Sequence, residues 1–184
     1  MSERETMHLR LVFTRPEAVD KTAAKSTPSR GHQLAFPYPE ASTVVFLDVT
    51  AIGRDEFARI IGDYSPGWII DVRVVPRLDT LALSRRSAFM LFDRSRAHYV
   101  DLFGRLGIKS YRAVESNPVF WGSAIYDLLK QSNRKGPYLL MFDNEQLMAS
   151  ADHVLPGIIK PAIGKAAQFA RLDRAATDLR PAVD

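Results

Sequence analysis

The sequence predicts an α/β fold, a three-layer sandwich in which helices cover both faces of a mainly parallel, four-stranded sheet. Short apolar runs rich in β-branched and aromatic residues are typical of strands that are buried on both faces. Segments with helical spacing of apolar residues separate these runs, and this alternation favours parallel pairing. Each of the four runs ends on an aspartate: Asp48, Asp71, Asp101 and Asp143.

The elements follow one another in a regular order. The four strands are expected at 44–48, 68–71, 98–102 and 138–142. Apolar side chains at helical spacing, from Phe57 to Tyr64, predict a helix at 55–64 between the first two strands. Ser84 is a good N-cap for the next helix, which should have about ten residues. Asn117, followed by a proline, predicts the start of a third helix before the last strand.

Two further helices are predicted beyond the fourth strand. The segment 147–155 has a helical pattern, and Pro156-Gly157 is expected to break it, because proline removes a helical hydrogen bond. The last helix is expected to start at Pro161 and to run through Phe169 and Leu172 before a polar tail.

Residues 1–41 are expected to form an arm, and residues 42–184 a single α/β domain. The arm contains several prolines and no sustained apolar period, so it cannot bury enough surface to offset the cost of ordering. A weak alternation that ends at Phe13 predicts a short strand, and Phe36 and Tyr38 are expected to pin the arm to the domain. The arm is otherwise expected to be flexible or bound to a protein partner.

The composition suits one soluble domain. The chain has 184 residues, 46% of them hydrophobic, which is enough for one core and short for two. It contains no cysteine, which excludes disulfides, thiolate metal sites and cysteine nucleophiles. Neither a secretory signal nor a membrane-length apolar run is visible, so the expected location is cytoplasmic. The formal charge of +4 favours anionic partners only weakly.

The four aspartates should lie along one edge of the sheet, since parallel strands end together. Ligands of open α/β sheets bind just outside this edge. Clustered carboxylates suit Mg²⁺ or acid–base catalysis, so Asp71, Asp48 and Asp143 are candidate catalytic residues and Asp101 is a candidate ligand contact. In the alternative interpretation each aspartate caps the turn that follows its strand. No spacing identifies a metal or a cofactor, and both stay unknown.

Arginines follow the second strand. Arg73 leaves this strand on the same side as Asp71, and Arg77 follows shortly after. Arg85 and Arg86 stand in the first turn of a helix, where they oppose the helix dipole while free N–H groups favour an anion. The pattern predicts a cradle for a phosphate or carboxylate group. In the alternative, Arg73 pairs with Asp71 or another carboxylate of the edge, and Arg85 and Arg86 point to solvent.

The segment 69–73, Ile-Ile-Asp-Val-Arg, with Pro76-Arg77 just after it, resembles a motif of the bacterial family called domain of unknown function 488. A helix with an inward phenylalanine after the first strand, and Tyr99 in the third strand, are also similar to that family. The resemblance covers about residues 44–155. It implies an α/β fold with a site centred on Asp71, Arg73 and Arg77, and it implies no substrate.

The chain departs from this family after the fourth strand. Members usually carry a Cys-His-Arg element there, whereas residues 143–148 read Asp-Asn-Glu-Gln-Leu-Met. The chain thus resembles a divergent member, and an activity that needs this element is not expected of it.

Three functions are compatible with these features. The first is a cytoplasmic domain that binds a phosphate-bearing ligand, a nucleotide or a nucleic-acid end, at the carboxyl edge of the sheet. The second is a hydrolase or glycosyl-transferring enzyme that uses the clustered aspartates. The third is a non-catalytic subunit of a larger bacterial assembly, for example in defence against phage, with the arm bound to its partner.

Overall fold

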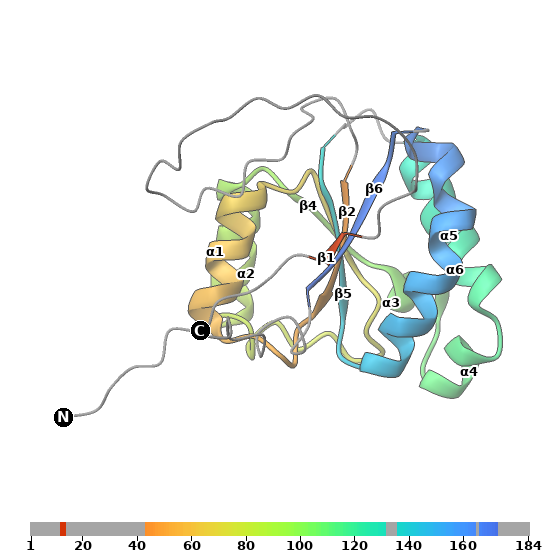
Figure 1. Cartoon of the computed structure of the whole chain (residues 1–184). Coiled ribbons are helices and arrows are strands. Elements are labelled where there is room, and N and C mark those ends of the chain that lie inside the picture. Colours follow the sequence, from red (N-terminus) through yellow and green to blue (C-terminus); the bar gives the residue numbers. More distant parts are fainter. Residues whose placement is uncertain (1–11, 14–42, 132–135, 165, 173–184) are drawn as a thin grey trace, which may run out of the picture.

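The computed structural model describes residues 12–13, 43–131, 136–164 and 166–172. These residues form three layers around a central sheet, as Figure 1 shows. One face is covered by α1 (Arg54–Tyr64) and α2 (Arg85–Arg94), and the other by α5 (Pro118–Gln131) and α6 (Glu145–Ile163). The predicted α/β sandwich is confirmed. The predicted arm lies outside the described residues, apart from the strand β1 (Val12–Phe13).

The sheet in the described part of the chain has six strands: the four predicted for it, the short strand β1, which ends at Phe13 as expected, and one strand that was not predicted. Their order is β1, β6 (Gln168–Leu172), β2 (Thr43–Asp48), β5 (Tyr138–Phe142), β3 (Trp68–Asp71) and β4 (His98–Asp101). The five strands from β6 to β4 are parallel, and only β1 pairs antiparallel, with β6. The four predicted strands therefore form the parallel core of a larger sheet.

The predicted last helix, from Pro161 through Leu172, is wrong. Gly164 ends α6, and Gln168–Leu172 is the strand β6, which pairs in parallel with β2. Phe169 packs on the α5–α6 side of the sheet, whereas Leu172 is buried on the α1–α2 side. Their spacing of three residues fits a helix turn as well as opposite faces of a strand, and the sequence alone does not separate the two.

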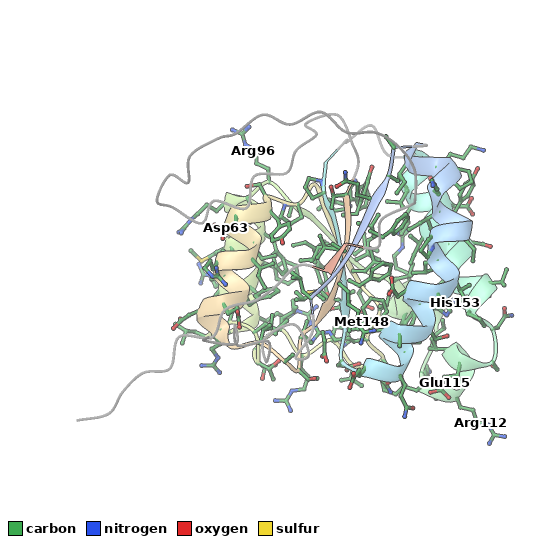
Figure 2. All side chains as sticks on the ribbon, in the orientation of Figure 1. Asp63, Arg96, Arg112, Glu115, Met148 and His153 are labelled. Carbon is green, nitrogen blue, oxygen red and sulfur yellow. The ribbon has the colours of Figure 1, made fainter. Side chains whose placement is uncertain are left out.

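The predicted break at Pro156-Gly157 is also wrong, because α6 continues through Pro156 and Pro161. A proline inside a helix removes one hydrogen bond and costs about 3 kcal/mol. Packing offsets this cost, since one side of α6 is buried against the sheet and α5: Leu147, Met148, Ala151, Leu155 and Ile159. Figure 2 shows Met148 between α6 and the sheet. Gly122 of α5 permits the close contact, because a Cβ there would lie 2.8 Å from Ile158 Cδ1.

The other helices begin where their caps predict. Ser84 Oγ accepts a hydrogen bond from the Ser87 N–H at 3.0 Å at the start of α2. Asn117 Oδ1 accepts one from the Phe120 N–H at 3.1 Å at the start of α5. Two short helices, α3 (Leu102–Leu106) and α4 (Tyr111–Glu115), were not predicted, because a single turn carries no apolar period. They matter because α4 reaches the carboxyl edge of the sheet.

The topology brings the four strand-end aspartates to one edge. β2, β5, β3 and β4 are neighbours in the sheet and run in the same direction, so Asp48, Asp143, Asp71 and Asp101 follow one another along it. The chain leaves β2 and β3 toward α1 and α2, but leaves β5 toward α6 on the opposite face (Figure 1). Ligands of open α/β sheets bind where neighbouring connections diverge in this way.

Candidate binding site at the carboxyl edge of the sheet

The centre of this edge is a buried ion pair between Asp71, the last residue of β3, and Arg73. Arg73 Nε donates to Asp71 Oδ1 at 2.7 Å, and Arg73 Nη2 donates to Asp71 Oδ2 at 2.6 Å. The exposed fraction is 0% for Asp71 and 2% for Arg73. The Arg73 backbone N–H also donates to Asp71 Oδ1, at 3.2 Å, which closes a tight turn after the strand. The pairing that the sequence allowed as the alternative role of Arg73 is therefore present.

Tyr99 of β4 is the third member of this cluster. Its hydroxyl donates to Asp71 Oδ2 at 2.9 Å, and its ring stacks on Phe92 of α2 with the centroids 5.4 Å apart. Tyr99 is opposite Ile69 in the register, and Ile69 shares a strand face with Asp71. The three polar groups therefore lie on the α2 side of the sheet, where aromatic rings shield them from water.

The electrostatics of the cluster follow from burial. Burial raises the pKa of the Asp71 carboxyl, and the hydrogen bonds from Arg73 and Tyr99 oppose this shift. Burial alone would lower the pKa of Arg73, but Asp71 outweighs it and the net shift is upward. Burial and the adjacent Asp71 also raise the pKa of Tyr99 well above its ordinary value. Tyr99 is therefore a neutral donor, and Arg73 is a permanent cation whose charge Asp71 balances.

Asp143, directly after β5, is another strand-end carboxylate of this edge. It is half-buried and accepts a hydrogen bond from the Tyr111 hydroxyl of α4. Burial and this hydrogen bond raise the pKa of Tyr111. The charge of Asp143 also contributes to the raised pKa of Arg73, less than Asp71 does. It is not a helix cap, because Asn144 caps α6 by accepting from the Leu147 N–H at 2.9 Å.

Asp48 and Asp101 stabilise the turns that follow their strands, which is the alternative role that the sequence allowed for the aspartates. Asp48 is 5% exposed, and its Oδ1 accepts from the Thr50 N–H at 2.8 Å and from the Thr50 hydroxyl at 2.7 Å. Asp101 Oδ1 accepts from the Gly104 N–H at 2.8 Å and caps α3. A Cβ at Gly104 would lie 2.3 Å from Asp101 Oδ2, so this cap needs a glycine.

Three predicted arginines are exposed on the connection from β3 and on the start of α2. Arg77, 67% exposed, pairs with Asp79 across 3.0 Å. The Arg85 guanidinium lies over the ring of Phe89, with 5.7 Å between its central carbon and the ring centroid. Arg86 is exposed in the first turn of α2. The structure therefore separates Arg73, which is enclosed, from Arg77, Arg85 and Arg86, which are open to solvent.

The described ranges contain no group of three or more His, Asp or Glu side chains arranged to hold a metal ion. None of their helices combines the length and the hydrophobicity needed to cross a bilayer.

The sequence did not mark Tyr99 and Tyr111 as site residues. Tyr99 could have been found from its position, since it stands two residues before the strand-end Asp101 and so shares the strand face of that residue. Tyr111 belongs to α4, and its contact with Asp143 spans 32 residues of sequence. No local pattern indicates such a contact.

Comparisons with known proteins identify no relative. No protein-family model matches the chain, and comparisons with curated proteins and with solved structures find no match. The functional argument therefore depends on the site itself.

Proposed function

We propose that this protein binds a phosphate-bearing ligand, a nucleotide or the phosphorylated end of a nucleic acid, at the carboxyl edge of its sheet. One observation carries the proposal. Residues 72–86, which leave β3 at this edge and enter α2, include four arginines, Arg73, Arg77, Arg85 and Arg86, and one acid, Asp79. A cationic segment beside diverging connections is the setting in which α/β sheets hold phosphates.

The enclosed and the exposed arginines have different parts in this proposal. Nε and Nη2 of Arg73 both donate to the Asp71 carboxylate, which balances the charge of the guanidinium. Arg73 therefore fixes the shape of the connection from β3 to α2 and adds little net charge. Arg77 and Arg85 contact the phosphate. The ion pair of Arg77 with Asp79 is exposed on both sides, and such pairs are worth about 0–1 kcal/mol, so a phosphate can displace the aspartate. In this proposal the half-buried Asp143 accepts a hydrogen bond from a ribose hydroxyl.

A titration with two variants tests this proposal. The parent protein is titrated with inorganic phosphate, a nucleoside 5′-monophosphate and a short 5′-phosphorylated oligonucleotide, with calorimetry as the readout. The double substitution Arg77→Ala/Arg85→Ala should weaken binding about tenfold or more, which corresponds to about 1.4 kcal/mol. Arg112→Ala is the matched control, because Arg112 is an exposed arginine that points away from the sheet on α4 (Figure 2). Absence of binding by the parent, or equal losses in both variants, rejects the proposal.

A second candidate is an enzyme that uses Asp143, and one observation favours it. Asp48 and Asp71 are buried and each accepts two or more hydrogen bonds, but Asp143 is partly exposed and carries Tyr111 as a proton-bearing neighbour. Hydrolysis or glycosyl transfer would then depend on Asp143 with Tyr111. In a screen of phosphate-ester and glycoside substrates, activity that Asp143→Asn abolishes and Asp48→Asn leaves intact would support this candidate over simple binding.

The family assignment stays a prediction. The motif at 69–73 and 76–77 supports membership of the domain of unknown function 488 family, and it coincides with the Asp71–Arg73 pair and the exposed Arg77. A bacterial origin and a cytoplasmic location are part of the same proposal.

A further inference from the structure

A groove runs between α1 and α2 on the outer surface of the molecule, beside the connection from β3 to α2. Its cavity volume is about 390 Å³. Residues of α1, α2 and the segment before α2 line it, among them Arg54, Leu81, Leu83, Met90, Leu91 and Arg94. The proposed phosphate site makes no use of this groove.

Much of the lining is apolar. Leu83 is 82% exposed and Met90 is 56% exposed, which makes them two of the most exposed large apolar side chains in the described residues. Isolated exposed leucines are ordinary, but two such side chains in one concavity form a patch. Removing apolar surface from water contributes about 25 cal/mol per Å², so an occupant that covers both side chains is stabilised. Methionine adapts to differently shaped partners, which suits a docking surface.

Two arginines line the groove, and Arg54 also donates from Nη2 to the backbone oxygen of Asp79 at 3.2 Å. Arg54 is the first residue of α1 and Arg94 is the last residue of α2, and both are exposed. α2 has ten residues, and at 1.5 Å per residue it is about 15 Å long. Asp55 also lines the groove, but it lies in the first turn of α1, where the helix N–H groups stabilise its carboxylate. The groove therefore combines exposed apolar side chains with two guanidinium groups.

We propose that this groove binds an acidic amphipathic helix of a partner protein. Apolar side chains of that helix, spaced three and four residues apart, pack between Leu83 and Met90. Carboxylates near its two ends pair with Arg54 and Arg94. This is the helix-in-groove mode of recognition, in which apolar anchors supply affinity and charge fixes the register.

The test uses the full chain and a synthetic probe. The probe is a fluorescein-labelled peptide of about fourteen residues, with leucines at helical spacing and glutamates near both ends. One control peptide has the same residues in permuted order, and another has lysine in place of each glutamate. Anisotropy titration should show binding of the acidic amphipathic peptide alone, and binding should weaken as salt is raised, because the arginines are exposed.

Three substitutions locate the binding surface. Met90→Glu and Arg94→Glu should each weaken binding about tenfold or more. Val119→Glu is the matched control, because Val119 is 59% exposed on α5, on the opposite face of the sheet, and this variant should bind as the parent does. All three positions are exposed, so the fold tolerates the changes, and circular dichroism verifies this.

Several results overturn the proposal. These are absence of binding by the acidic peptide, equal binding of the permuted or lysine peptide, and undiminished binding by Met90→Glu. Self-association of the parent chain in sedimentation, lost in Met90→Glu, would assign the groove to a second copy. Peptide binding that appears only after Phe36→Ser/Tyr38→Ser would assign it to the chain's own N-terminal segment.

Discussion

Replacing Arg73 by methionine should destabilise the fold by about 3–5 kcal/mol, because it leaves a buried carboxylate without its cation. Asp71 and Arg73 are 0% and 2% exposed, so water does not screen the pair. With N–O distances of 2.6 and 2.7 Å, the two charge centres lie about 4 Å apart. At an effective dielectric constant of about 20, this separation corresponds to about 4 kcal/mol.

The experiment is a double-mutant cycle with an internal control. Urea denaturation followed by tryptophan fluorescence gives the free energy of unfolding of the parent, Asp71→Asn, Arg73→Met and the double variant. The double variant should be more stable than the sum of the single losses predicts, because neither charge is then left alone. In that variant Tyr99 still has an oxygen to donate to. Arg77→Met is the control, since Arg77 and Asp79 also stand two residues apart but are exposed, and its cost should be about 0–1 kcal/mol.

Equal costs for Arg73→Met and Arg77→Met would refute this reasoning. That result would mean that water or another cation reaches the Asp71 carboxylate once Arg73 is gone. Additive losses in the cycle would be just as damaging, because coupling is required when two groups share two hydrogen bonds.

Further predictions concern the neighbours of this pair and the helix caps. Tyr99→Phe removes a hydrogen bond to a carboxylate and should cost about 1.5–3 kcal/mol in urea denaturation; a loss near zero would mean that Asp71 does not need this donor. Burial and the charge of Asp63 raise the pKa of Tyr64 to about 12, above its ordinary value near 10. The neutral Tyr64 hydroxyl therefore contributes fully to the free energy of unfolding below pH 10, and this contribution falls as the pH rises toward 12. Tyr64→Phe should flatten the decline of the unfolding free energy at alkaline pH. An unchanged decline would exclude Tyr64 as its cause. Ser84→Ala removes the N-cap of α2 and should lower the unfolding free energy by about 1 kcal/mol, whereas Ser84→Gly should cost only a few tenths.

The sequence was informative about the sheet because buried parallel strands impose a strong local pattern. Each of the four runs that end on aspartate is a strand, and each predicted cap is at its helix start. The pattern failed where tertiary packing outweighs local preference. α6 keeps two prolines because its buried side contacts α5 and the sheet, and β6 forms because β2 offers a free edge for pairing. Neither partner is visible in the local sequence.

In the site, too, contacts that are local in sequence could be predicted and long-range contacts could not. Asp71 and Arg73 are only two residues apart in the sequence, so their ion pair could be predicted from the end of the strand. The donors that complete the cluster come from 28 and 32 residues away in sequence, Tyr99 on Asp71 and Tyr111 on Asp143. Such contacts depend on strand order and on a one-turn helix, neither of which has a periodic signal.

The accessibility of the carboxylates decides between binding and catalysis at this edge. A carboxylate can take a proton or a metal only if an oxygen is free and can be approached. Asp48 and Asp71 are buried and already accept two or more hydrogen bonds each, and Asp101 caps α3. Asp101 and Asp143 are the two half-buried strand-end aspartates; Asp101 caps a helix through Oδ1, whereas Asp143 accepts from the Tyr111 hydroxyl. One carboxylate next to a tyrosine with a raised pKa is a sparse set for hydrolysis. Exposed guanidinium groups on the adjoining connection need no such partner to hold an anion. The balance of groups at this edge thus favours binding over catalysis.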